Sequence, residues 1–178
     1  MKTQNVKTKI EKYFFLHPTK KLRVREIERN IKIPLPSAIR YVNELEGEKI
    51  LRIIKISNIK LFSPDRTSVK FIRAKQLFNL KQIYDSGLLD YLKEKYFNPN
   101  IILFGSYSKG EDTEESDIDL YIETPSKIKN LSLSPFENKL KRNLQIFNYN
   151  HINDIKDPEL KNNIFNGIRL NGELEVFK

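Results

Sequence analysis

One short stretch, GSYSKGEDTEESDIDL at residues 105–120, gathers residue types that bind phosphate groups and metal ions. Asp117 and Asp119 alternate with apolar residues, so both carboxylates should project from one face of a strand. Two adjacent anions repel unless a cation lies between them, and Mg²⁺ prefers carboxylate, water and phosphate oxygens. Gly105 lets backbone N–H groups approach a phosphate closely, and Ser106 adds a hydroxyl donor. The stretch therefore predicts a site for a metal-bound polyphosphate.

Two strands must position these groups. The apolar run IILF (101–104) ends directly at Gly105, and DIDLYIE (117–123) carries the aspartates with its apolar side chains on the opposite face. The intervening acids are expected to be exposed and without a catalytic role; they are Glu111, Asp112, Glu114 and Glu115.

Gly-Ser, ten residues and Asp-x-Asp is a pattern that resembles the nucleotidyltransferases of the DNA polymerase beta superfamily, most closely the small minimal ones. The resemblance covers about residues 86–178 and implies a small mixed-sheet domain. It implies that Gly105 and Ser106 grip the triphosphate of an NTP. It also implies that Asp117 and Asp119 hold Mg²⁺ (or Mn²⁺) while an acceptor hydroxyl attacks the α-phosphorus and pyrophosphate leaves.

The chain departs from that family at the third carboxylate, which the family has on a later strand. The corresponding strand here is NLQIFNY (143–149), and Gln145 stands where the acid is expected. An amide oxygen can coordinate a metal but cannot take a proton at neutral pH. Later acids remain as substitutes if the fold brings one near; they are Asp154, Asp157, Glu159, Glu173 and Glu175.

The net charge of +9 belongs entirely to the first third of the chain. Residues 1–66 hold 16 Lys or Arg and 7 Asp or Glu, whereas residues 67–178 hold 16 of each. Such asymmetry suggests two modules, the first of which faces a polyanion. A lysine-rich solvated surface is the alternative explanation.

In the first module, the pattern of apolar residues predicts two helices, a turn, a third helix and a hairpin, in that order, over residues 4–64. The third helix should pack Ile39, Val42 and Leu45 and end at Gly47, and a turn at 57–58 should join two strands. This order resembles a winged helix-turn-helix, in which the third helix enters the DNA major groove and the wing contacts the backbone. The resemblance implies DNA contacts from Ser37, Arg40, Tyr41, Lys55, Asn58 and Lys60. A winged helix that only dimerises or docks is the alternative.

The remaining segments complete an α+β protein, with an N-terminal winged helix-turn-helix and a small mixed-sheet polymerase-beta-like domain. We expect domains at 1–66 and 86–178 and a connector helix at 67–85 that packs through residues including Val69, Leu77 and Ile83. Two further elements are expected, a helix from Pro158 to Ile168 and a terminal strand at 172–177.

Composition narrows the class of protein. The absence of cysteine excludes disulfides and thiolate metal sites. No apolar run approaches the roughly 20 residues of a membrane helix, and the first residues lack signal-peptide features. We therefore expect a cytoplasmic protein without membrane contact.

Two functions fit these observations. In the first, an Mg-dependent enzyme moves NMP from NTP to a hydroxyl of a protein or nucleic acid, as the antitoxin of a toxin-antitoxin pair by analogy with minimal enzymes that modify a HEPN-type toxin. In the second, a DNA-binding transcription regulator carries a nucleotidyltransferase domain impaired at Gln145. A homodimer is compatible with either function.

Overall fold

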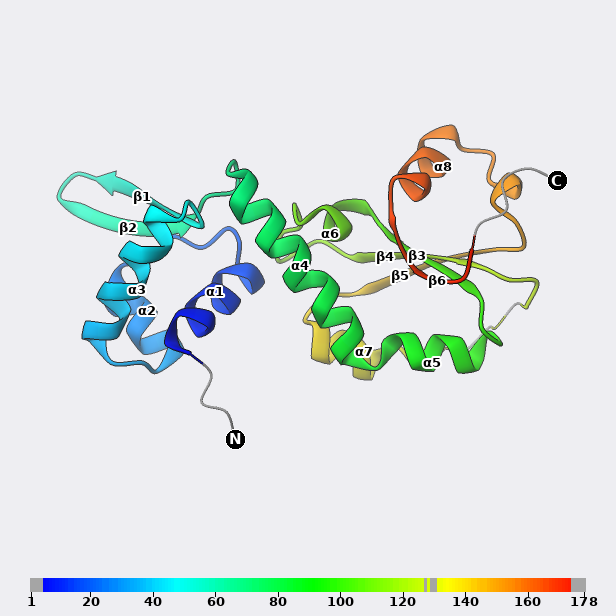
Figure 1. The fold of residues 1–178 in the computed structure, drawn as a ribbon, viewed down its shortest axis with the longest axis horizontal. Helices are drawn as coiled ribbons and strands as arrows, with labels where there is room; N and C mark the ends of the chain where they lie inside the picture. Colours follow the sequence, from blue (N-terminus) through cyan, green and yellow to red (C-terminus); the bar gives the residue numbers. More distant parts are fainter. Residues whose placement is uncertain (1–4, 127, 129–130, 174–178) are drawn as a thin grey trace. The chain divides into compact units, whose positions relative to one another are not determined.

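The computed structural model describes residues 5–126, 128 and 131–173. The chain divides into two compact units, Met1–Phe78 and Asn79–Lys178, and the boundary falls inside helix α4, Val69–Ser86. Figure 1 shows the elements of each unit in chain order. No helix within the described ranges combines the length and the hydrophobicity that crossing a lipid bilayer requires.

The first unit has three helices followed by a two-stranded hairpin. Its elements are α1 (Val6–Leu16), α2 (Val24–Ile31), α3 (Leu35–Gly47), β1 (Leu51–Ile56) and β2 (Ile59–Pro64). Apolar faces of all three helices meet in one core, with Phe14, Ile27 and Val42 fully buried. Ile56 pairs with Ile59, which leaves residues 57–58 as the hairpin turn. The order of elements is the one predicted, and membership of the winged-helix family stays a prediction.

One detail of α3 corrects the sequence pattern. Ile39, expected on the packing face, is 45% exposed, and Ala38 is buried instead with Val42 and Leu45. Positions 38, 42 and 45 form a single stripe because an α-helix turns once every 3.6 residues. The helix ends at Gly47, as predicted, and the left-handed residue that follows it is Lys49, with φ 61°.

Helix α4 supplies side chains to both cores. Phe71 packs in the core of the first unit, and Ile83 packs in that of the second. Val69 and Leu77, expected as packing positions, are 60% and 68% exposed. The expectation was wrong because the buried positions, which include Asn79, recur four residues apart on another side of the helix.

The second unit is built on a four-stranded mixed sheet. Its elements are α5 (Leu88–Lys95), β3 (Asn100–Phe104), α6 (Gly105–Lys109), β4 (Ile118–Glu123), α7 (Ser134–Leu140), β5 (Leu144–Tyr149), a 3₁₀ turn (Ile152–Asp154), α8 (Pro158–Phe165) and β6 (Ile168–Asn171). The strand order is β5-β4-β3-β6, with β4 and β5 parallel and the other two pairs antiparallel. The predicted small mixed sheet is confirmed.

Both faces of this sheet are covered. Ile118, Leu120 and Ile122 of β4 face α5 and α7, while Tyr121 faces α8, as the alternation of a strand requires. Figure 1 shows α8 on one side of the sheet and α5 and α7 on the other. Asp119 lies on the same face as Tyr121, so the side of the sheet that carries α8 also carries the aspartates.

The end of the chain differs from the prediction. Helix α8 ends at Phe165, and Ile168 opens β6, which pairs with β3. Gly167 fits this tight junction because a Cβ there would lie 2.6 Å from Cγ2 of Ile102 and 2.7 Å from the carbonyl oxygen of Leu103. The strand predicted at 172–177 lies mostly in residues 174–178, which are outside the described residues, as is Glu175.

Candidate active site

Gly105 and Asp119 lie against each other where β3 ends. Phe104, the last residue of β3, is the register partner of Asp119 in β4. Gly105 has φ 72°, and a Cβ placed on it would overlap Oδ2 of Asp119 and come within 3.1 Å of its Cγ. The carboxylate therefore occupies the space that any other residue type at position 105 would fill. Both the backbone angle and the close approach require glycine.

The strand then turns at once into the short helix α6. Gly105 and Ser106 are its first residues, and Gly110, with φ 73°, ends it. Oγ of Ser108 donates a hydrogen bond to the carbonyl oxygen of Gly105 at 2.8 Å, which fixes the first turn. The first N–H groups of a helix have no partner within that helix, so backbone donors at Gly105 and Ser106 lie next to the carboxylate of Asp119.

Asp117 and Asp119 form the acidic part of the site. Asp117 precedes β4 and Asp119 lies within it, two residues apart and therefore on the same face. Burial raises the pKa of Asp119, and the charge of Asp117 raises it further. The carboxylate of Asp119 is thus destabilised in its charged form, which a divalent cation would relieve. A set of two carboxylates beside backbone N–H donors fits Mg²⁺ together with a polyphosphate.

Two carboxamides face these two acids, Gln145 within β5 and Asn143 directly before it. Gln145 is the register partner of Asp119 in the parallel pair, at the position where the sequence places it. Nδ2 of Asn143 donates to Oδ1 of Asp117 at 3.2 Å. Asn143 was not among the predicted site residues, although its place two residues before Gln145 puts it on the same face.

The later acids do not complete the site. Oδ2 of Asp154 accepts from the backbone N of His151, and Oδ1 of Asp157 accepts from the backbone N of Glu159, so both cap local turns. Within residues 5–126, 128 and 131–173, no group of three or more His, Asp or Glu side chains could hold a metal ion. Gln145 therefore stands without a carboxylate substitute among the described residues.

Asp112 corrects the expectation of an exposed acidic loop. Its side chain is fully buried: Oδ1 accepts from Nδ2 of Asn79 at 2.7 Å, and Oδ2 lies 3.4 Å from the guanidinium of Arg142. Asn79 also donates to the carbonyl oxygen of Tyr107 at 2.9 Å. This network ties the segment between Gly105 and Asp117 to α4 and to the start of β5, and spacing along the chain gave no sign of it.

Comparison with known proteins adds the family. Residues 86–171 match the model of the nucleotidyltransferase domain. A candidate protein adenylyltransferase of Methanocaldococcus jannaschii is 42% identical over 74 residues, which are 41% of this chain and 76% of that protein. The chain belongs to the nucleotidyltransferase family. A second candidate protein adenylyltransferase of the same organism is 37% identical over 84 residues, 45% of this chain and 96% of that protein. A search of the solved structures found no match.

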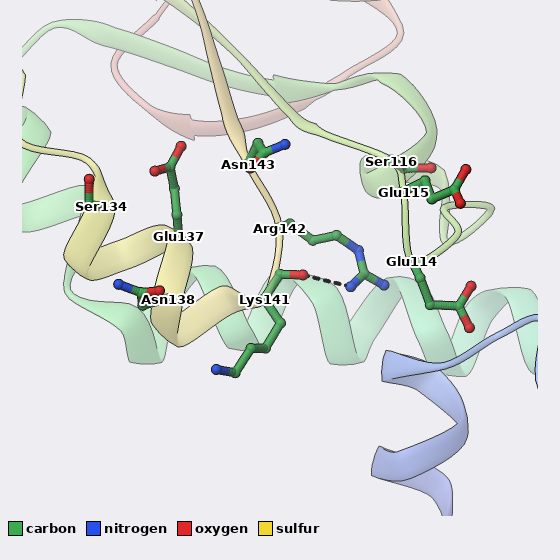
Figure 2. Close-up of a pocket in the computed structure, with 9 residues that line it drawn as sticks. All are labelled: Glu114, Glu115, Ser116, Ser134, Glu137, Asn138, Lys141, Arg142 and Asn143. Atoms are coloured by element: carbon green, nitrogen blue, oxygen red, sulfur yellow. Dashed lines mark hydrogen bonds between the residues drawn. The ribbon is translucent and has the colours of Figure 1, made fainter.

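The nucleotidyltransferase domain has a polar pocket of about 440 Å³ beside Asp117. Figure 2 shows that α7, the start of β5 and the residues before Asp117 line it. Asn143, which contacts Asp117, and Ser116 both belong to its lining, so the pocket adjoins the acidic site. Its charged members are Glu114, Glu115, Glu137, Lys141 and Arg142.

The residues predicted to contact DNA lie in the first unit. On α3, Arg40 is exposed and its guanidinium lies 5.2 Å from the centre of the Tyr41 ring, while Ser37 is partly buried one turn before Tyr41. On the hairpin, Lys55 and Lys60 are register partners one pair away from the turn that contains Asn58.

A second pocket, which lies in the first unit, adds two cations, Arg23 and Arg25, to the residues predicted to contact DNA. It measures about 310 Å³ and is lined in part by Arg23, Arg25, Asn58 and Lys60. Its cations lie at the start of α2 and on β2. These positions favour contact with an anionic surface, and DNA as the ligand stays a prediction.

Proposed function

We propose that the nucleotidyltransferase domain transfers AMP from ATP to a hydroxyl group of a protein, in a reaction that depends on Mg²⁺. The observation that carries this proposal is the contact of Gly105 with the carboxylate of Asp119, with Asp117 on the same face. The names of the two relatives support ATP as the nucleotide and a protein as the acceptor.

Four residues have roles in this proposal. Gly105 and Ser106 bind the β- and γ-phosphates through the free N–H groups at the start of α6. Asp117 and Asp119 hold Mg²⁺ and thereby orient the α-phosphate. When bound, Mg²⁺ neutralises negative charge on the phosphates and favours loss of pyrophosphate. The protein contributes mainly by placing the acceptor hydroxyl in line with the α-phosphorus.

Gln145 limits this chemistry. Its amide cannot accept the proton of the acceptor hydroxyl at neutral pH, because an amide is not basic enough. The proton must leave to water or to a group of the acceptor protein. Since general-base assistance typically contributes about 10²–10⁴-fold, we expect slow transfer with small-molecule acceptors and faster transfer with the cognate protein.

The basic first unit favours a second candidate function. Arg40 and the hairpin residues Lys55, Asn58 and Lys60 support binding to DNA, so the chain would act as a transcription regulator in which the impaired domain senses nucleotide. The two functions also combine, because an antitoxin that modifies a HEPN-type toxin can repress its own promoter. Alanine at Arg40 should then weaken binding to promoter DNA, with a smaller dependence of affinity on salt.

One labelling experiment tests the first proposal. The protein is incubated with ATP labelled at the α-phosphate, Mg²⁺ and a lysate of its own cells, beside Asp119→Asn and the control Glu111→Gln, which removes an exposed charge of the same loop outside the pocket lining. We expect a labelled band that resists nuclease, is lost with protease and is absent for Asp119→Asn alone. Equal labelling by Asp119→Asn, or label only on nucleic acid, contradicts the proposal. Runs with GTP, CTP and UTP measure the nucleotide preference.

A further inference from the structure

The strand β5 has a free edge beside the candidate site. In the order β5-β4-β3-β6 it is the outermost strand, and no strand in the described residues pairs with its far side. The carbonyl oxygens of Asn143 and Tyr149 accept hydrogen bonds from the N–H groups of Ile118 and Thr124. Ile118 is the first residue of β4, and Thr124 directly follows its last. The odd-numbered residues of β5 therefore point their backbone groups at β4, and the even-numbered residues point theirs outward.

The outward groups begin at Leu144 and continue along the strand. The N–H of Leu144 donates to Oε1 of Glu137 at 3.0 Å, a side chain that takes the place of a neighbouring strand. Beyond it, the outward backbone groups are the carbonyl oxygen of Leu144 and both groups of Ile146 and Asn148. Such an edge is a template for another extended chain.

The free edge of β5 lies close to the residues proposed to transfer AMP. Gln145 is level with Asp119, so an added strand would lie about 4.8 Å beyond β5 and about 10 Å from β4, given the spacing of paired strands. A tyrosine on that strand, pointing to the same face as Gln145, would extend its hydroxyl over the acidic site. The strand would continue at the Asn143 end into the 440 Å³ pocket.

The charge of the pocket favours a polypeptide over a nucleic acid as the molecule that binds there. Glu114, Glu115 and Glu137 outnumber its cations, and Arg142 is already paired with Asp112. This surface repels a nucleic acid and attracts a basic side chain. A free backbone edge likewise pairs with a polypeptide.

We infer that the free edge of β5 binds the acceptor as an extended polypeptide strand, with its modified hydroxyl over Asp117–Asp119 and a basic residue in the adjoining pocket. This inference rests on the proposed transfer to a protein hydroxyl. It assigns a recognition role to backbone groups of Ile146 and Asn148, outside the residues that bind nucleotide.

The test uses the full-length protein and capped nine-residue peptides that have a central tyrosine, β-branched flanks and a terminal lysine. Amide hydrogen exchange of β5 is followed with and without peptide, and binding of Mg²⁺-ATP is measured separately. We expect at least tenfold slower exchange at Ile146 and Asn148 with peptide. Two peptides are N-methylated at alternate amides, one at the odd and one at the even positions. Because only one of these sets of N–H groups would face β5, one peptide should lose the protection and the other should keep it.

Protein variants give a second measurement. Ile146→Pro removes an outward N–H without breaking a bond to β4, and Ile146→Val keeps that N–H. Ile146→Pro should bind Mg²⁺-ATP as the wild type does but label the peptide at least tenfold more slowly, while Ile146→Val stays within twofold. The N-methylated peptides keep the test decisive if Ile146→Pro does not fold.

The outcomes separate this inference from the proposed function. Protection of β5 by peptide without binding of Mg²⁺-ATP supports the edge and contradicts the transferase. Binding of Mg²⁺-ATP with no protection, or with equal effects of both N-methylation patterns, overturns the edge. Protection without peptide, in a dimer that Ile146→Pro converts to a monomer, also overturns it, because a second copy of the chain then occupies β5.

Discussion

Asp119 of β4 and Gln145 of β5 are register partners in adjacent parallel strands, on one face of the sheet. A carboxylate therefore faces a carboxamide at the centre of the candidate site. The partner Asn143 repeats this arrangement with Asp117. The face thus presents two acids where β4 begins and two amides where β5 begins.

Restoring an acid at position 145 should increase transfer. Gln145→Asp would add a metal ligand and a proton acceptor beside Asp119. We therefore expect at least tenfold faster labelling of the acceptor, because general-base assistance typically contributes about 10²–10⁴-fold. The measurement is the initial rate with α-labelled ATP, with Gln145→Asn as the neutral control. Equal rates for all three proteins would show that proton removal does not limit the reaction.

Alanine at Gly105 should abolish the site, whereas alanine at Gly87 should not. Both glycines have positive φ, 72° and 84°, so each alanine costs about 1–2 kcal/mol of backbone strain. Only at Gly105 does the new Cβ also overlap Asp119; at Gly87 no atom lies within 4 Å. Binding of Mg²⁺-ATP, measured by calorimetry, should be lost in Gly105→Ala and retained in Gly87→Ala. Comparable affinity in the two variants would contradict the close contact.

The neutral variant Asp119→Asn should be more stable than the wild type in the absence of divalent cations. The pKa of Asp119 lies above its ordinary value of 3.8 in the folded state, because of burial and the charge of Asp117. The folded state therefore holds the proton more tightly than the unfolded state, and the wild type loses stability as pH rises from the unfolded to the folded pKa.

Thermal unfolding in EDTA measures this effect. The difference in Tm between variant and wild type should be small near pH 3 and grow toward pH 7, with the variant higher. Addition of Mg²⁺-ATP should raise the Tm of the wild type alone. If the Tm of the variant, measured relative to that of the wild type, decreases from pH 3 to pH 7, the pKa of Asp119 is not raised by folding.

Removal of Asp112 should strongly destabilise the second unit. Its carboxylate and Arg142 are both buried, and loss of one partner of such a pair typically costs about 3–5 kcal/mol. Urea unfolding of Asp112→Ala measures the change, and Glu115→Ala, at an exposed acid of the same segment, should change stability by less than about 0.5 kcal/mol. The double variant with Arg142→Met should recover part of the loss.

Local patterns predicted much of this molecule. The strands of the second unit and the position of Gln145 follow from alternation, because a strand fixes which side chains share a face. The spacing from Gly105 to Asp119 identified two residues that the fold brings into contact.

Tertiary packing determined the rest. The burial of Asp112 depends on Asn79 and Arg142, which are 33 and 30 residues away. Ile39, Val69 and Leu77 fit a helical pattern but are exposed, because neighbouring elements cover another stripe of each helix. The end of α8 depends on a close approach of Gly167 to β3, which no local signal marks.

The contact from Asn79 to Asp112 and Tyr107 determines where this protein can be divided. The family match begins at residue 86, yet Asn79 and Ile83 lie before it and support the loop and the core of the second unit. A chimera joined at residue 86 would therefore lose the amide that holds Asp112, while a junction before Asn79 would keep it. When this domain is exchanged between proteins, by design or in evolution, the last turns of α4 must therefore be kept together with the second unit.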